Sequence, residues 1–135
     1  MGTPMGAKRT APRKPMKRRL NIKITPLDKM FSEFIRKRAD YTCEYCGLKR
    51  KVLHCSHFIG RRYRNTRWHQ DNASCLCYSC HNYMHDFPST HRDFFIKRLG
   101  SERVDQLEYI ARSSNKVDKE LILKELKEKM KGLCI

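Results

Sequence analysis

Two Cys-x-x-Cys pairs, Cys43/Cys46 and Cys77/Cys80, constrain this chain more than any other feature. Two short knuckles of this kind can hold one tetrahedral zinc ion between them through four thiolates. Zinc with four thiolate ligands has no open coordination position, so its expected role is structural. Binding such an ion can supply on the order of 10 kcal/mol of folding free energy. A small fold held together by zinc is therefore the first prediction.

The other cysteines and histidines leave one alternative ligand set. Zinc could be held by the first cysteine pair together with His81 and His85, as in a zinc finger. The 34 residues between Cys46 and His81 far exceed the usual finger spacing of about 12, so four thiolates remain the better prediction. Three cysteines are left over: Cys55, Cys75 and Cys134. We interpret the first two as small buried hydrophobic residues.

The composition limits both the size of the core and the kind of partner. With 135 residues, of which 39% are hydrophobic and 33% charged, the chain is expected to form one small domain with tails. The 30 Lys and Arg residues outweigh 14 Asp and Glu and give a net charge of +16, more than solubility requires. That balance predicts a polyanionic partner, DNA or RNA. The chain has no long apolar run and no apolar segment of a secretory signal, so we expect a cytoplasmic protein without a membrane partner.

Local patterns predict an α+β fold in three segments. Residues 1–24 carry eight Lys and Arg, three prolines and no acid, and are expected to form a disordered basic arm along phosphates. Residues 25–112 are expected to form the zinc-bound domain. Its predicted elements are a helix from Thr25-Pro26, a knuckle over 41–50, a strand over 51–57, a loop over 60–72, a strand over 73–77, a helix over 78–85, and two helices separated by Gly100 with Ser101 as a cap. The spacing of apolar residues within 113–135 predicts an amphipathic helix, which could pack on the domain or pair with a second copy.

A second series of residues, His57, Asn72, His81 and His85, lies between the knuckles and just after them. A neutral imidazole such as that of His57 can take a proton from water, as phosphodiester hydrolysis requires. His81 and His85 stand one helical turn apart on one face, so both can reach a single divalent ion. Asn72 can tie the loop to the second strand and orient His57. The ordered set predicts metal-assisted cutting of nucleic acid.

The set resembles the HNH nuclease superfamily, whose ββα-metal (His-Me finger) site uses a base histidine, an asparagine and helical histidines. The matching segments are Cys55-Ser56-His57-Phe58, Asp71-Asn72 and Cys80-His81-Asn82-Tyr83-Met84-His85. The intervals match as well, with 15 residues from His57 to Asn72, nine from Asn72 to His81 and four from His81 to His85. In colicin-type members a metal-binding histidine directly precedes the base. This chain has Ser56 there, a poor metal ligand.

A closer resemblance is to the phage lambda NinG (Rap) recombination family. It is carried by Ser56-His57-Phe58, Thr66-Arg67-Trp68, Asp71-Asn72 and Cys77-x-x-Cys80, and continues through Arg98-Leu99-Gly100. Family members typically have Gly-His-Tyr, Leu-Arg-Phe, an asparagine and Cys-x-x-Cys-Asn at the first four places. The resemblance covers roughly residues 25–110 and implies a structure-directed nuclease that acts on branched DNA during recombination, in the cytoplasm of a bacterial host. NinG-like members lack the helical histidine pair, so this chain is the more HNH-like.

Four arginines, Arg61, Arg62, Arg64 and Arg67, lie between the expected base and Asn72. A planar guanidinium can bind two phosphate oxygens and stabilise charge in a transition state. Arg67 matches the arginine of the NinG family and is predicted to grip the scissile phosphate. The other three are predicted to bind DNA.

These features together predict a metal-dependent DNA endonuclease with a structural zinc and a catalytic divalent ion, Mg²⁺, Mn²⁺ or Zn²⁺. His57 would activate water, Asn72 would orient His57, and His81 and His85 would hold the ion. The alternatives are a sequence-specific or general nicking HNH enzyme, a non-catalytic zinc-knuckle protein that binds nucleic acid, and a ribosome-associated zinc protein. The preferred DNA, the catalytic metal and the oligomeric state stay open, although a homodimer would suit a symmetric junction.

Overall fold

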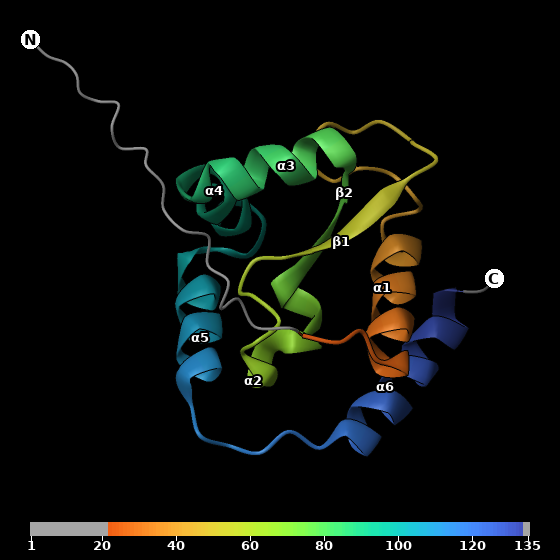
Figure 1. Ribbon diagram of the computed structural model, residues 1–135, viewed down its shortest axis with the longest axis vertical. Helices are drawn as coiled ribbons and strands as arrows, with labels where there is room; N and C mark the ends of the chain where they lie inside the picture. The colour runs from red at the N-terminus through yellow and green to blue at the C-terminus, as the bar shows by residue number, and fades with distance from the viewer. Residues whose placement is uncertain (1–21, 134–135) are drawn as a thin grey trace, which may run out of the picture.

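The computed structural model describes residues 22–133, and the fold is α+β, as predicted (Figure 1). The basic arm predicted for 1–24 lies almost entirely outside the described residues, as does Cys134. The elements in order are α1 (Pro26–Arg38), β1 (Leu53–His57), α2 (Arg64–Arg67), a 3₁₀ turn (Gln70–Asn72), β2 (Ala73–Cys77), α3 (Tyr78–Asp86), α4 (Pro88–Leu99), α5 (Ser101–Arg112) and α6 (Lys119–Leu133). None of the helices within 22–133 is long and apolar enough to cross a membrane.

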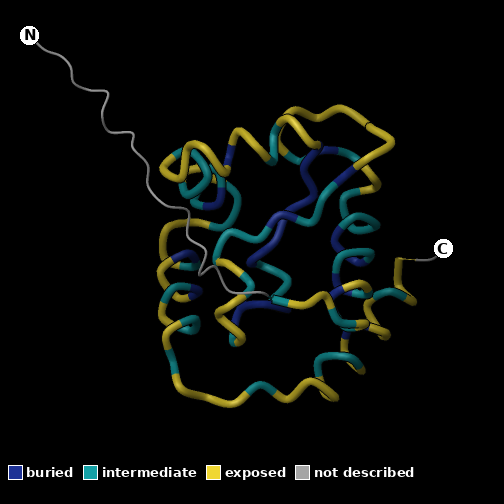
Figure 2. Tube along the Cα trace, viewed as in Figure 1, coloured by how far each residue is buried: buried dark blue, intermediate teal, exposed yellow. Residues whose placement is uncertain are grey.

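The two strands form an antiparallel pair that leads directly into a helix. Leu53 pairs with Cys77 at one end and His57 with Ala73 at the other. Every residue of β2 is buried, and Figure 2 shows the buried residues concentrated around the strands at the centre of the molecule. Cys77 ends β2 and is also the N-cap of α3, so no loop separates strand from helix. The order of the elements is therefore strand, strand, helix, as the local sequence patterns predicted.

Helix α1 begins at the predicted capping box. The backbone N–H of Asp28 donates to the Thr25 hydroxyl at 3.2 Å, and the Thr25 N–H donates to the Asp28 carboxylate at 2.8 Å. Phe31, Phe34 and Ile35 on the apolar face are buried in the core, where α1 packs on both strands. This packing gives one side of the sheet its hydrophobic cover.

The C-terminal helix α6 packs on the domain rather than standing free. Leu126 is buried, and Ile122 and Met130 are partly buried against the same core, at the predicted four-residue spacing. Helix α6 lies beside α1 (Figure 1). Of the two uses left open for this apolar stripe, packing within the chain is the one observed.

Two local predictions need correction. Ser101 is the first residue of α5 and makes no capping bond, because Gly100 occupies the N-cap position. Gly100 has a φ of 95°, a region that favours glycine, so its predicted place at the end of α4 is confirmed. The segment 60–72 is not a plain loop, because it contains α2 and the 3₁₀ turn.

Candidate metal centre and active site

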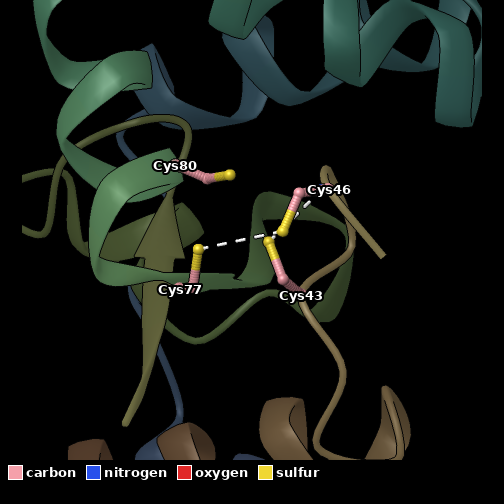
Figure 3. A group of neighbouring side chains, drawn as sticks. All are labelled: Cys43, Cys46, Cys77 and Cys80. Atoms are coloured by element: carbon pink, nitrogen blue, oxygen red, sulfur yellow. Dashed lines mark hydrogen bonds between the residues drawn. The ribbon is translucent and has the colours of Figure 1, made fainter. Parts of the chain in front are cut away.

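The four predicted zinc ligands lie together in one cluster. All four sulfur atoms of Cys43, Cys46, Cys77 and Cys80 are within 4.8 Å of one another. Figure 3 shows the first pair coming from the knuckle and the second from the junction of β2 and α3. The Sγ atoms of Cys46 and Cys77 are 3.9 Å apart, close to the separation of about 3.8 Å expected for zinc with Zn–S bonds of about 2.3 Å. The geometry fits a structural zinc site.

The knuckle is shaped by backbone hydrogen bonds around Cys43. Gly47, with a φ of 78°, turns the chain so that its N–H donates to the Cys43 carbonyl at 2.9 Å. The N–H of Cys46 points at the Cys43 sulfur at 3.5 Å. Burial alone would raise the pKa of Cys43, but hydrogen bonds from the N–H groups of Cys46, Cys77 and Tyr45 lower it to about 7. The knuckle therefore favours the thiolate that a metal requires.

Glu44 and Arg98 attach this knuckle to β2. The N–H of Glu44 donates to the Cys75 carbonyl at 2.8 Å, and its carboxylate accepts from the Cys75 N–H at 2.9 Å. Arg98 of α4 donates to the same carboxylate at 3.0 Å and to the Ala73 carbonyl at 3.1 Å. The zinc knuckle and α4 thus provide hydrogen-bond partners for backbone groups of β2 that β1 does not pair. Sequence reasoning did not identify Glu44, whose partner is 54 residues away.

His57, the predicted base, is partly buried at the end of β1. Its Nε2 atom is 3.0 Å from the backbone carbonyl oxygen of Arg67. A carbonyl can only accept a hydrogen bond, so Nε2 carries the proton and Nδ1 keeps the lone pair. Burial lowers the pKa of His57 to about 4 despite this bond, and the charge of Arg61 acts in the same direction. The ring is therefore neutral near pH 7, and its Nδ1 atom is unprotonated.

Asn72 is fully buried and holds the backbone on both sides of this imidazole. Its side-chain oxygen accepts from the Ile59 N–H at 2.8 Å, while its amide donates at 3.0 Å to the carbonyls of Ile59 and Thr66. Its own carbonyl accepts from the Phe58 N–H at 2.8 Å. Asn72 therefore ties the segment after His57 to the turn that ends in Arg67. It positions the ring through the main chain.

The phosphate-gripping role predicted for Arg67 does not fit its surroundings. The side chain is buried, and its Nε and Nη2 atoms donate to the two oxygens of Asp28 at 2.9 and 2.5 Å. Nη2 also donates to the Lys23 carbonyl at 2.9 Å, and the Trp68 indole donates to Asp28 at 2.9 Å. The guanidinium is thus part of the core. The atom of Arg67 that contacts His57 is its backbone carbonyl oxygen.

The two predicted metal ligands on α3 face the same hollow as His57. A cleft of about 750 Å³ runs along β1 between α1 and α3, and its lining includes His54, His57 and His81. An adjoining cavity of about 240 Å³ is lined by His57, His81, His85 and His91, among others. Burial and the neighbouring rings of His54 and His85 lower the pKa of His81, which favours the neutral ring, in which one nitrogen keeps a lone pair. The structure thus brings the predicted base and both predicted ligands around one space.

The histidines are less tightly gathered than the cysteines. The ligand atoms of the four cysteines all lie within 4.8 Å of one another. Within residues 22–133, no group of three or more ligand atoms that includes the histidines is gathered as closely. His81 is partly buried and His85 is exposed. The pair offers two imidazole ligands, fewer than the four of a closed structural zinc site.

The other three arginines differ in position. Arg61 lines the cleft beside His57, and its guanidinium has no hydrogen bond or ion pair within the described part of the chain. Arg62 stacks on the Tyr63 ring, 5.0 Å from its centroid. Arg64 is exposed and lines a separate hollow. Of the three, only Arg61 is placed to meet a phosphate at the site.

Cys55 and Cys75 face each other across the two strands and are not ligands of the cluster. Burial raises the pKa of Cys55 to about 12 and of Cys75 to about 11, so both are neutral thiols. Cys75 is fully buried and Cys55 partly so. Their environment agrees with the interpretation as small hydrophobic residues.

Sequence reasoning missed His54 as a residue of the site. Its ring centroid is 5.0 Å from that of His81, in an edge-to-face arrangement. A signal was available, because His54 precedes Ser56 by two residues and alternate residues of a strand share a face.

Comparison with known families matches residues 7–134 of the chain to the family described as bacteriophage lambda NinG protein. This is a longer span than the sequence resemblance suggested, and it includes the cysteine cluster, β1, β2 and every helix that the structure describes. No curated protein and no solved structure matched. The chain belongs to the bacteriophage lambda NinG protein family.

Proposed function

We propose that this protein is a metal-dependent DNA endonuclease that cuts branched DNA. The observation that carries the proposal is the state of His57. Its Nε2 proton is committed to the Arg67 carbonyl, its Nδ1 lone pair is available, and it lines the same cavity as His81 and His85. A neutral base beside two imidazole ligands is an arrangement that suits metal-assisted phosphodiester hydrolysis.

Each residue of the site has a separate role in the proposed hydrolysis. A divalent ion held by His81 and His85 would polarise the phosphate and stabilise the leaving oxygen. His57 would accept the proton of the attacking water at Nδ1, while the Arg67 carbonyl holds the ring through Nε2. Arg61 would bind a non-bridging phosphate oxygen from the cleft wall. Asn72 keeps the two backbone segments around His57 in place.

The choice of substrate is supported by charge and by family. A net charge of +16 gives affinity for DNA phosphates without reading the base sequence. Membership of a phage lambda family and the resemblance to its recombination proteins support branched DNA over an ordinary duplex. The four-cysteine cluster is assigned a structural role because four thiolates would leave zinc no open position.

The proposal is tested with the zinc-loaded protein and three DNA substrates of matched sequence: linear duplex, nicked duplex and four-way junction. We expect cleavage of the junction with added Mg²⁺ or Mn²⁺ and none in EDTA under conditions that retain the structural zinc. A His57→Ala preparation controls for contaminating nuclease. Tight junction binding without cleavage under any ion would instead identify a non-catalytic binding protein. Equal cutting of all three substrates would identify a general nicking enzyme.

A further inference from the structure

Two histidines that line the cleft each carry a buried ring nitrogen without a hydrogen-bond partner within residues 22–133. The Nε2 atom of His54 and the Nδ1 atom of His81 are both shielded from solvent and have no hydrogen-bond partner among the described residues. The two rings come from facing elements, β1 and α3, and their centroids are 5.0 Å apart at an interplanar angle of 81°. Both residues line the cleft that contains His57.

Leaving such atoms unsatisfied is costly. A buried polar atom without a hydrogen-bond partner destabilises the fold relative to one that is hydrogen-bonded. Two of them on neighbouring rings double that cost, and packing alone does not require histidine at either place. Binding of one ion by both imidazoles would satisfy both atoms at once.

We infer that His54 is a ligand of the divalent ion together with His81. It would replace the metal-binding histidine that colicin-type enzymes have at the position of Ser56. Ser56 occupies the position directly before the base, is buried, and carries a hydroxyl that binds metals poorly. His54 lies two residues earlier on the same strand. The inference rests on the proposed function for the presence of an ion, and adds one ligand and a metal preference to it.

The metal preference follows from the donor atoms. Imidazole nitrogen suits Co²⁺, Ni²⁺ and Zn²⁺, whereas Mg²⁺ prefers oxygen ligands and retains its waters. A site with His54, His81 and His85 offers nitrogen only. The chain should therefore bind Co²⁺ or Ni²⁺ at this site more tightly than Mg²⁺.

Cobalt titration of the full-length, zinc-loaded protein tests the inference without measuring cleavage. The visible absorption of Co²⁺ reports binding, and thiolate-to-cobalt charge transfer would reveal any exchange into the cysteine cluster. We expect one Co²⁺ per chain without charge transfer, and at least tenfold weaker binding in His54→Ala and in the size-conserving His54→Asn. His69→Ala serves as the matched control, because His69 is a partly buried histidine that does not line the cleft. The Co²⁺ affinity of this variant should stay within twofold of that of the wild type.

The outcomes separate this inference from the proposed function. Wild-type affinity in both His54 variants, with loss of the ion in His81→Ala, would overturn the role of His54 and leave the nuclease proposal intact. Absence of a bound Co²⁺ in the wild-type protein would also overturn it. Weakened binding in the His54 variants would support the inference even if the protein cut no DNA. Thermal unfolding of each variant establishes that it is folded at the titration temperature.

Discussion

Asp28→Asn is predicted to destabilise the protein by about 3–5 kcal/mol, because it leaves the Arg67 charge buried without a partner. The side chains of Asp28 and Arg67 are only 7% and 10% exposed. Asparagine keeps the size of the side chain and one acceptor oxygen, so the capping box can survive. It cannot accept both guanidinium bonds as an anion, which is the interaction that offsets the desolvation of Arg67.

This magnitude is large against the whole stability of a small domain, about 5–15 kcal/mol. At about 4 °C or more per kcal/mol, a loss of 3 kcal/mol lowers Tm by at least about 12 °C. The damage should also reach the site, because Arg67 holds His57 through its carbonyl. Cleavage by the folded variant is therefore expected to fall as well.

Urea unfolding followed by far-UV circular dichroism, at pH 7 and fixed free zinc, measures this loss. The matched control is Asp105→Asn, which removes a carboxylate that is 70% exposed and 3.3 Å from Arg92. Exposed ion pairs contribute about 0–1 kcal/mol, so this control should change little. An Asp28→Asn midpoint no lower than that of Asp105→Asn would refute the reasoning from burial.

Three further predictions concern zinc, pH and phosphate binding. Removing the structural ion with a strong chelator, or replacing Cys77 by Ser, should unfold the domain, as shown by loss of helical dichroism together with loss of one zinc per chain. The single-turnover cleavage rate should not fall between pH 8 and pH 6. The pKa of His57 is lowered from 6.5 to about 4, so the base is protonated only as the pH falls towards that value. An inflection of the rate near pH 6.5 would contradict this. Arg61→Gln should reduce the cleavage rate at least tenfold. Arg64→Gln removes an arginine of the same segment that does not line the cleft, and should alter the rate by less than about threefold. Similar losses in both variants would indicate a general effect of charge.

The parts of the fold that sequence could predict are those set by local pattern. The capping box of Thr25 and Asp28 involves residues three apart, and the stripes of α1 and α6 follow helical periodicity. The cysteine cluster joins distant segments, yet it was predictable because Cys-x-x-Cys spacing encodes a coordination geometry. The intervals from His57 to His85 predicted a shared site for a similar reason.

Long-range partners without such a code could not be predicted. Arg67 was expected at a phosphate because it lies in a basic loop and matches the arginine of the NinG family, but its partner Asp28 is 39 residues away on another element. Nothing in the spacing distinguishes Arg67, which is buried, from Arg61, which lines the cleft. The same holds for the pairing of Glu44 with Arg98. Tertiary packing decides which charge is in the core, and a local pattern does not contain that information.

The most direct test of the account compares chemistry with binding in His57→Ala. Single-turnover cleavage of a four-way junction, junction affinity and zinc content are measured on the same preparation. The account predicts a rate at least about 100-fold below wild type, junction affinity within twofold of wild type, and one zinc per chain. Cleavage at a rate near that of the wild type, or loss of zinc or of junction binding together with cleavage, would contradict the assignment of His57 as the base.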